Sequence, residues 1–162
     1  MKKVLAIDPG DTESAYVLWD GENIIDKAKE KNDIVLRKIS EIFFDVPNLE
    51  VAIEMVASYG MPVGKTVFDT CVWIGRFIQV CDSLSVKYRQ VYRKEIVSHI
   101  CHSARAKDSN VIQALVDRFG DVHEHGKYGK GTKKNPGFFY GFYKDVWQSF
   151  AVGVFYFDNF AE

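Results

Sequence analysis

Apolar and polar residues alternate along this chain in two rhythms, and the order of those rhythms predicts a mixed sheet covered by helices. Short runs rich in apolar residues predict five strands, at residues 3–8, 13–19, 23–26, 51–54 and 86–91. The turn signals Pro9-Gly10 and Asp20-Gly21 separate the first three strands, which are therefore expected to form an antiparallel meander. Helical segments separate the last two strands, which are expected to run parallel in the same sheet.

Apolar residues at three- and four-residue spacing predict the helices. The first is expected to begin at Asn32, a candidate N-cap, and to end before Pro47. Further helices are expected at residues 65–83, 93–100, 108–119 and 144–157. The last of these is almost entirely apolar, so it is expected to be buried. Residues 120–142 contain six glycines and four lysines, which predicts a mobile basic loop.

The composition fits one soluble domain spanning residues 1–162, with 47% hydrophobic residues. A domain of this size buries roughly two-thirds of its unfolded surface, so it can build a core without metals or disulfides. Three cysteines without CxxC spacing predict reduced thiols and a cytoplasmic protein. No stretch approaches the roughly 18 apolar residues of a membrane helix, and the first residues do not resemble a signal peptide.

Charge is distributed unevenly although the net charge is only −1. Residues 1–62 carry 7 basic and 12 acidic side chains, whereas residues 87–144 carry 12 basic and 5 acidic ones. A basic half in a nearly neutral chain suggests a polyanionic partner that meets one face, with the acids held elsewhere or at a metal site. A solvated basic surface without a partner explains the same charges equally well.

Three acidic residues adjoin segments that are expected to be buried: Asp8 and Glu54 end apolar strands, and Asp145 opens the apolar last helix. Burying an isolated carboxylate costs several kcal/mol, so acids gathered at the edge of a core need cations or protons. Hard oxygen donors favour Mg²⁺ or Mn²⁺, and two such ions about 3.5–4 Å apart can catalyse phosphodiester hydrolysis. Each acid alone also has a structural explanation, as a turn former, an edge residue or a helix-dipole partner.

The first strand and its turn resemble a known family. Residues 4–10, Val-Leu-Ala-Ile-Asp-Pro-Gly, followed by Ser14-Ala15-Tyr16, resemble the opening of RuvC-type Holliday junction resolvases, members of the ribonuclease H-like superfamily. The family's later landmarks follow in order at residues 52–56, 88–97 and 145–151. Residues 103–108 and 131–137 are most similar to the RuvC-like resolvases of bacteriophages.

The resemblance implies a ribonuclease H-like fold and Mg²⁺-dependent cutting of four-way and other branched DNA. It implies a homodimer, each subunit cutting one strand, in the cytoplasm of a phage-infected bacterium. Asp8, Glu54 and Asp145 match the family's acidic ligands, with two ions per site implied. Gln148 stands at the fourth acidic position, where its amide oxygen can ligate a hard cation without bringing charge. A water or a rearranged acid such as Glu13 is an alternative for that position.

Contacts to DNA are expected mostly at phosphates, because a nuclease for branch points must first recognise shape. The candidate contacts are Lys65, Arg76, Arg93, Lys94, Arg105, Lys107, Lys130, Lys133 and Lys134. Tyr59 and Met61 follow Glu54 in a glycine-containing loop and are candidate wedges between bases, with loop packing or a dimer contact as the equal alternative. The helix at 65–83 is apolar on more than one face, which favours contact with a partner subunit over a broad core helix.

Three other functions remain open from the sequence. A ribonuclease for RNA–DNA hybrids or a flap nuclease would use the same acids. A junction-binding protein would have become catalytically weak through Gln148. A fragment of a phosphate-binding ATPase would share the Asp-Pro-Gly turn. The histidines and Cys101 lack finger-like spacing, so a zinc site is not expected.

Overall fold

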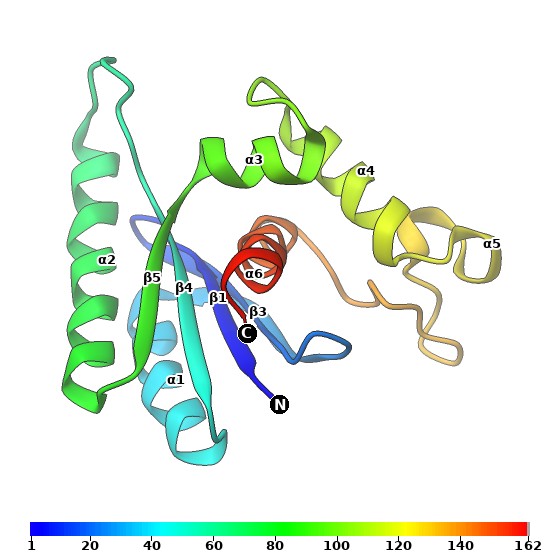
Figure 1. Ribbon diagram of the computed structural model, residues 1–162, viewed down its shortest axis with the longest axis horizontal. Coiled ribbons are helices and arrows are strands. Elements are labelled where there is room, and N and C mark those ends of the chain that lie inside the picture. Colours follow the sequence, from blue (N-terminus) through cyan, green and yellow to red (C-terminus); the bar gives the residue numbers. More distant parts are fainter. Residues whose placement is uncertain (162) are drawn as a thin grey trace.

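The computed structural model describes residues 1–161 and contains one five-stranded sheet; residue 162, the last of the expected domain, lies outside the described residues. The strands are β1 (Lys3–Asp8), β2 (Glu13–Trp19), β3 (Ile24–Lys31), β4 (Leu49–Met55) and β5 (Lys87–Tyr92). Their order in the sheet is β3-β2-β1-β4-β5, with β1 to β3 antiparallel and β1, β4 and β5 parallel (Figure 1). The predicted mixed sheet is confirmed.

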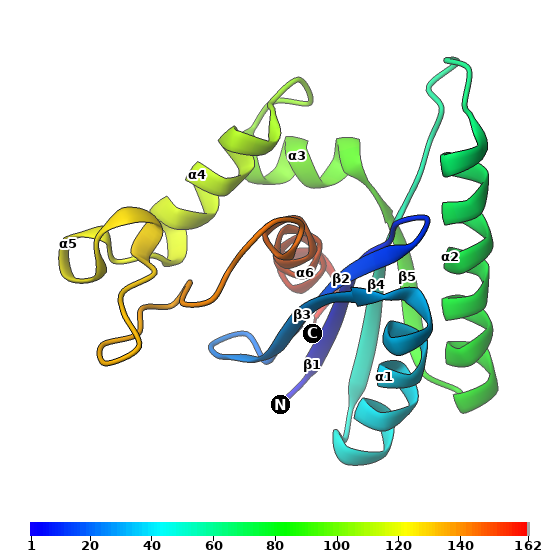
Figure 2. The same ribbon diagram turned by 180° about the vertical axis from the view of Figure 1, so that it is seen from behind.

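Helices cover both faces of this sheet. They are α1 (Asn32–Asp45), α2 (Lys65–Leu84), α3 (Arg93–Cys101), α4 (Asp108–Phe119), α5 (Val122–His125) and α6 (Val146–Phe160). The helices α1 and α2 lie on one face, whereas α6 lies on the other with α3 and α4 packed on it (Figures 1 and 2). None of the helices described between residues 1 and 161 combines the length and apolarity needed to cross a membrane.

Successive residues of β1 enter two separate cores. Leu5 and Ile7 pack with α1 and α2, whereas Val4 and Ala6 pack with α6. A strand covered on both faces has to be apolar at every position, which explains the uninterrupted apolar run of β1. The helix α6 approaches β1 closely at Gly153, where an added Cβ would lie 3.2 Å from the Cβ of Ala6. Apolar packing therefore fixes β1 and α6 relative to each other.

The strand β3 is longer than expected and runs to Lys31 instead of ending at residue 26. It is an edge strand, paired on one side with β2, and its residues 27–31 contain no β-branched or aromatic residue. Pairing with β2 thus decides the structure of a segment whose local sequence does not favour a strand. This correction matters for the site, because Lys29 lies in the added part.

Asn32 does not cap α1, contrary to the prediction. The N-cap position belongs to Lys31, and the side chain of Asn32 is buried. Ser14 Oγ donates to Asn32 Oδ1 at 2.5 Å, and Asn32 Nδ2 donates to the Gly10 carbonyl at 2.9 Å. Tertiary hydrogen bonds outweigh the local capping preference here, and they hold the turn that follows Asp8.

The segment 120–142, predicted as a mobile basic loop, contains short regular elements and is anchored in the core. It holds α5, a 3₁₀ turn at Lys127–Gly129 and an isolated bridge between Gly131 and Pro136. Phe139 and Phe142 are fully buried against α6 and its neighbours. The loop prediction rested on the glycines and lysines and did not consider these two aromatic side chains, which anchor the segment in the core.

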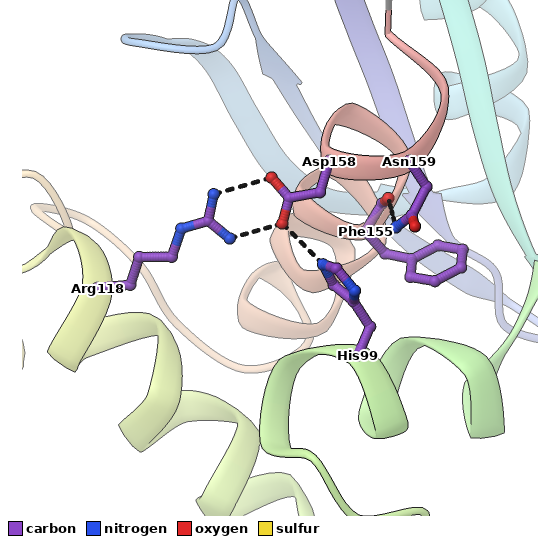
Figure 3. Close-up of polar contacts among 5 residues, drawn as sticks. All are labelled: His99, Arg118, Phe155, Asp158 and Asn159. Carbon is purple, nitrogen blue, oxygen red and sulfur yellow. Dashed lines mark hydrogen bonds and ion pairs between the residues drawn. The ribbon is translucent and has the colours of Figure 1, made fainter.

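A polar cluster joins α3, α4 and α6 (Figure 3). The Arg118 guanidinium donates to both carboxylate oxygens of Asp158, at 2.6 and 2.8 Å, and His99 Nε2 lies 2.8 Å from Asp158 Oδ2. The hydrogen bond from Arg118 lowers the pKa of Asp158 below its ordinary value. The cluster ties α3 and α4 to α6, and α3 carries Arg93 into the site described below.

We expect Asp158→Asn to lower the free energy of unfolding at neutral pH by about 0.5–1 kcal/mol, because the ion pairs of this exposed carboxylate are screened by solvent. The pKa of Asp158 is lower in the folded state, so its contribution is present above the unfolded value of about 3.9 and is lost as the pH falls through the folded value. Urea unfolding at a series of pH values should show the variant losing less stability than wild type below about pH 4.

Glu22→Gln, at an exposed position, is the control and should stay within about 0.5 kcal/mol of wild type. Equal stability curves for Asp158→Asn and wild type would contradict a stabilising role for the cluster.

Candidate active site

One pocket brings together the acids that the sequence singled out. Its volume is about 170 Å³, and it is lined by Asp8, Glu54, Arg93, Asp108, Asp145 and Gln148. Because β1 and β4 are adjacent and parallel, their carboxyl ends lie at the same edge of the sheet, and the start of α6 meets them there. The structure thus places four predicted residues in one pocket, whereas their role as metal ligands stays a prediction.

Each acid is held by an element whose position is fixed by apolar packing. Asp8 is the last residue of β1 and precedes the turn that Asn32 holds. Glu54 is the penultimate residue of β4 and is paired with Val91 of β5. Asp145 immediately precedes α6, and its carbonyl accepts the first-turn hydrogen bond from Ser149 N–H at 2.9 Å. The acids therefore meet because strands and a helix meet.

The two strand-end acids repel each other in a poorly solvated place. Burial, and next the negative charges of Glu54 and Asp145, raise the pKa of Asp8 well above its ordinary value. Burial also raises the pKa of Glu54, although the Arg93 guanidinium acts in the opposite direction. Both carboxylates are thus poised to take up a cation or a proton.

Two cationic side chains compensate other acids at the pocket. Lys29 Nζ donates to Asp145 Oδ2 at 2.5 Å, and this hydrogen bond raises the pKa of the ammonium. The Arg93 guanidinium donates to Gln148 Oε1 and to Asp108 Oδ1. Positive charge therefore lies beside Asp145, Gln148 and Asp108.

Sequence reasoning missed Lys29 and Asp108 as members of the site. Lys29 lies beyond the predicted end of its strand, so the sequence did not predict on which face of the sheet its side chain lies. Asp108 begins α4, and an acid in the first turn is common in any helix, so no signal distinguished it. A strand prediction extended to residue 31 would have pointed to Lys29, because it would have placed this residue in register with β1 and β2.

The donor set suits a divalent cation chemically, because it consists of hard carboxylate and amide oxygens around a pocket of repelling acids. As the side chains stand, however, no three His, Cys, Asp or Glu residues among positions 1–161 are arranged to hold one metal ion. Lys29 and Arg93 bind Asp145, Asp108 and Gln148 instead. The expected ligand trio therefore shares a pocket without forming a complete ligand group.

Some candidate DNA contacts lie next to this pocket. Arg93 and Lys94 line a second pocket of about 320 Å³ together with Tyr59, Val97, Ala104 and Ala106. Arg105 and Lys107 are exposed in the connection between α3 and α4. Tyr59 is 62% and Met61 72% exposed, so both project from the loop that follows β4.

The other candidate contacts come from α2 and from the segment beyond α4. Lys65 opens α2 and binds Asp69, whereas Arg76 lies over the Trp73 ring, 4.1 Å from its centroid. Lys130, Lys133 and Lys134 belong to the segment beyond α4, which lies on the opposite side of α6 from α2 (Figures 1 and 2). The candidate DNA contacts thus belong to several separate elements, and Lys130 lies 5.9 Å from the centroid of the Trp147 ring near the start of α6.

Comparison with known proteins identifies the fold. No family model matches the chain, and no curated protein sequence matches it. A solved structure of Thermus thermophilus RuvC has a TM-score of 0.67 over 95% of this chain and 94% of that chain, at 13% identity. T. thermophilus RuvC in complex with Holliday junction substrate has a TM-score of 0.67 over 96% and 93%, at 10% identity. The chain has the RuvC fold.

At these identities the likeness to RuvC establishes the fold alone. The ribonuclease H-like architecture expected from the sequence is therefore confirmed, while the assignment to a bacteriophage branch is not tested. On the RuvC fold, the chemistry of this chain has to be argued from its own pocket.

We expect Asp8→Asn to raise the free energy of unfolding by about 0.5–2 kcal/mol in the presence of a chelator, because it removes one of several repelling charges. Thermal and urea unfolding in EDTA measure the change. Asp20→Asn is a matched control with the opposite expected sign, because the Asp20 carboxylate accepts N–H bonds from Glu22 and Asn23 at 2.9 and 2.6 Å. Equal destabilisation by both substitutions would contradict repulsion at Asp8.

Proposed function

We propose that this protein is a divalent-metal-dependent endonuclease that cleaves Holliday junctions and related branched DNA. The observation that carries the proposal is the gathering of Asp8, Glu54 and Asp145 at one pocket of a RuvC fold. One RuvC structure of the same fold is in complex with Holliday junction substrate, which supports branched DNA as the partner. The likeness of residues 103–108 and 131–137 to phage resolvases supports a further part of the proposal, namely that the protein acts in the cytoplasm of a phage-infected bacterium on recombination or replication intermediates.

Asp8, Glu54 and Asp145, with the amide oxygen of Gln148, are the proposed holders of Mg²⁺ or Mn²⁺. When bound, the metal supplies acidity that makes water a competent nucleophile at neutral pH and stabilises negative charge on the leaving oxygen. The chain's own part is positioning: β1 and β4 fix the two strand-end carboxylates, and Arg93 orients Gln148. Hydrolysis of one phosphodiester bond consumes one water and needs no protein nucleophile.

The proposed DNA path runs from the carboxylates across α3. Arg93, Lys94, Arg105 and Lys107 offer positive charge on that side, and Tyr59 offers an aromatic face beside them. Such side chains hold phosphates and stack on unpaired bases without reading sequence. Lys65, Arg76, Lys130, Lys133 and Lys134 are proposed to contact the outer arms of a junction, and Met61 to act as a wedge beside Tyr59.

The cleavage test compares labelled four-way junction, flap, linear duplex and RNA–DNA hybrid, with Mg²⁺ and with chelator. We expect paired, symmetric nicks in the junction only when Mg²⁺ is present. Asp8→Asn should reduce cleavage by about 1,000-fold or more, because it removes several kcal/mol of transition-state stabilisation, while junction binding is kept.

Glu22→Gln is the control variant and should cut like wild type. Unaltered cleavage by Asp8→Asn would contradict the role of this carboxylate. Cleavage of only the RNA–DNA hybrid, or of only the flap, would contradict the four-way junction as the substrate and identify the hybrid or the flap instead.

A junction-binding protein with little activity is the second candidate. It is favoured by one observation, namely that the acids among residues 1–161 do not form a three-ligand group as they stand. In the same assay this candidate predicts tight, structure-selective binding in gel shift and no nicks at any Mg²⁺ or Mn²⁺ concentration.

A homodimer is proposed because two related cuts in a junction call for two active sites. The outer face of α2 supports this proposal, since Phe68 and Val72 are one turn apart and are 60% and 61% exposed. Exposed apolar residues at this spacing are suited to a two-fold interface.

We expect Phe68→Glu to weaken self-association by about 30-fold or more, corresponding to about 2 kcal/mol, because truncating a central aromatic contact has effects of that size. Sedimentation equilibrium measures the association. Phe44→Glu on α1 is the control, because Phe44 is even more exposed but lies on another surface. Monomeric wild type, or equal effects of both substitutions, would contradict α2 as the interface.

A further inference from the structure

Lys29 reaches the carboxylate pocket through the register of the sheet. In neighbouring strands, Lys29 of β3 is paired with Ala15 of β2, and Ala15 is paired with Asp8 of β1. Paired residues in adjacent strands share a face, so Lys29 and Asp8 lie on the same face of the sheet with only a small alanine between them. The Lys29 N–H donates to the Tyr143 hydroxyl at 3.0 Å, which holds β3 beside the start of α6. The approach of this lysine to the acids is therefore built into the fold.

The ammonium of Lys29 lies directly beside the Asp145 carboxylate. It contacts Asp145 Oδ2 at 2.5 Å, and its side chain is only 21% exposed. The neighbouring Gln148 is a neutral amide whose oxygen already accepts from Arg93. On this side of the pocket, the donors that a metal ion would use are thus a carboxylate bound by an ammonium and an amide bound by a guanidinium.

The opposite side of the pocket is formed by Asp8 and Glu54. Within the described part of the chain, neither of these carboxylates forms an ion pair with Lys29 or Arg93, whose ion-pair partners are Asp145 and Asp108. Arg93 and Lys29 act on these two carboxylates only through their charge, without a direct ion pair. Carboxylate oxygens that no side-chain cation contacts are open to a divalent cation. The two sides of the pocket therefore differ in their ion pairing: Lys29 contacts the carboxylate on one side, whereas neither Lys29 nor Arg93 forms an ion pair with the two carboxylates on the other.

We propose that this centre binds one divalent ion, on the side of Asp8 and Glu54, and that Lys29 supplies beside Asp145 the positive charge of a second ion. The inference rests on the proposed function for its metal requirement, and it departs from the two ions that the family resemblance implies. It also narrows the proposed metal ligands to Asp8 and Glu54, because Lys29 binds Asp145 and Arg93 binds Gln148. A lysine ammonium is a compact point charge, so it can neutralise charge near Asp145 without the six oxygen ligands that Mg²⁺ demands.

The experiment counts bound Mn²⁺ per subunit by electron paramagnetic resonance, for the full chain alone and in complex with a four-way junction. We expect one ion in wild type and two in Lys29→Met, which keeps the length of the side chain and removes its charge. Lys29→Arg, which restores the charge, should return the count to one. Lys31→Met is the matched control, because Lys31 lies on the same face of β3 opposite Glu13, and it should bind one ion.

A second readout follows the cleavage rate against Mg²⁺ concentration below saturation. Its logarithmic slope should be about one in wild type and about two in Lys29→Met, because the number of ions taken up sets the order of the reaction. Two ions in wild type, or one ion in a folded Lys29→Met, would overturn the inference.

The counting result is independent of the proposed function. One ion in wild type and two in Lys29→Met, with no cutting of the junction, would leave the inference standing and reject the nuclease. Binding of no ion by wild type, with or without DNA, would overturn both.

Discussion

The forced meeting of like charges at the ends of buried elements is the constraint on which the rest of this structure depends. Asp8, Glu54 and Asp145 project from β1, β4 and the start of α6 into one pocket. The backbone positions of the three acids are fixed, because two apolar cores hold the strands and the close approach at Gly153 holds α6. The packing energy of the whole fold thus holds together groups that would separate if the chain were loose.

Burial of an acid does not by itself mark a functional site in this protein, as Glu50 shows. Glu50 lies four residues before Glu54 on β4 and is only 7% exposed. Burial alone would raise its pKa, but the Tyr156 hydroxyl and the Lys2 ammonium, 3.3 Å away, bring that pKa below its ordinary value. Direct hydrogen bonds and ion pairs therefore distinguish Glu50, a structural glutamate, from Glu54, which still needs a cation, although both lie on the same strand and the same face.

The sequence predicted the sheet and most helices because apolar periodicity reports burial directly. The helix α4 has the predicted bounds, and Asp8 and Glu54 were recognisable because each follows an apolar strand. Periodicity does not report which cation faces which acid. Lys29 was missed because pairing with β2, and not the local sequence preference, extends β3 to this residue. The buried hydrogen bonds of Asn32 were missed because the local sequence indicates only helix capping for an asparagine at this position, whereas its actual partners are distant in sequence.

The glycine-rich segment after α4 acts on the site through aromatic packing, in addition to any contact with DNA. The rings of Phe139 and Phe142 lie 4.7 and 5.0 Å from the Trp147 ring, centroid to centroid, at the first turn of α6. Between them, Lys144 has a φ of 44°, a left-handed conformation that is unfavourable for a residue with a Cβ. Because aromatic packing on both sides of Lys144 holds this turn, Asp145 is delivered to the pocket at the start of α6. The segment that resembles a surface loop thus positions the helix-borne carboxylate, and the strain at Lys144 is part of that placement.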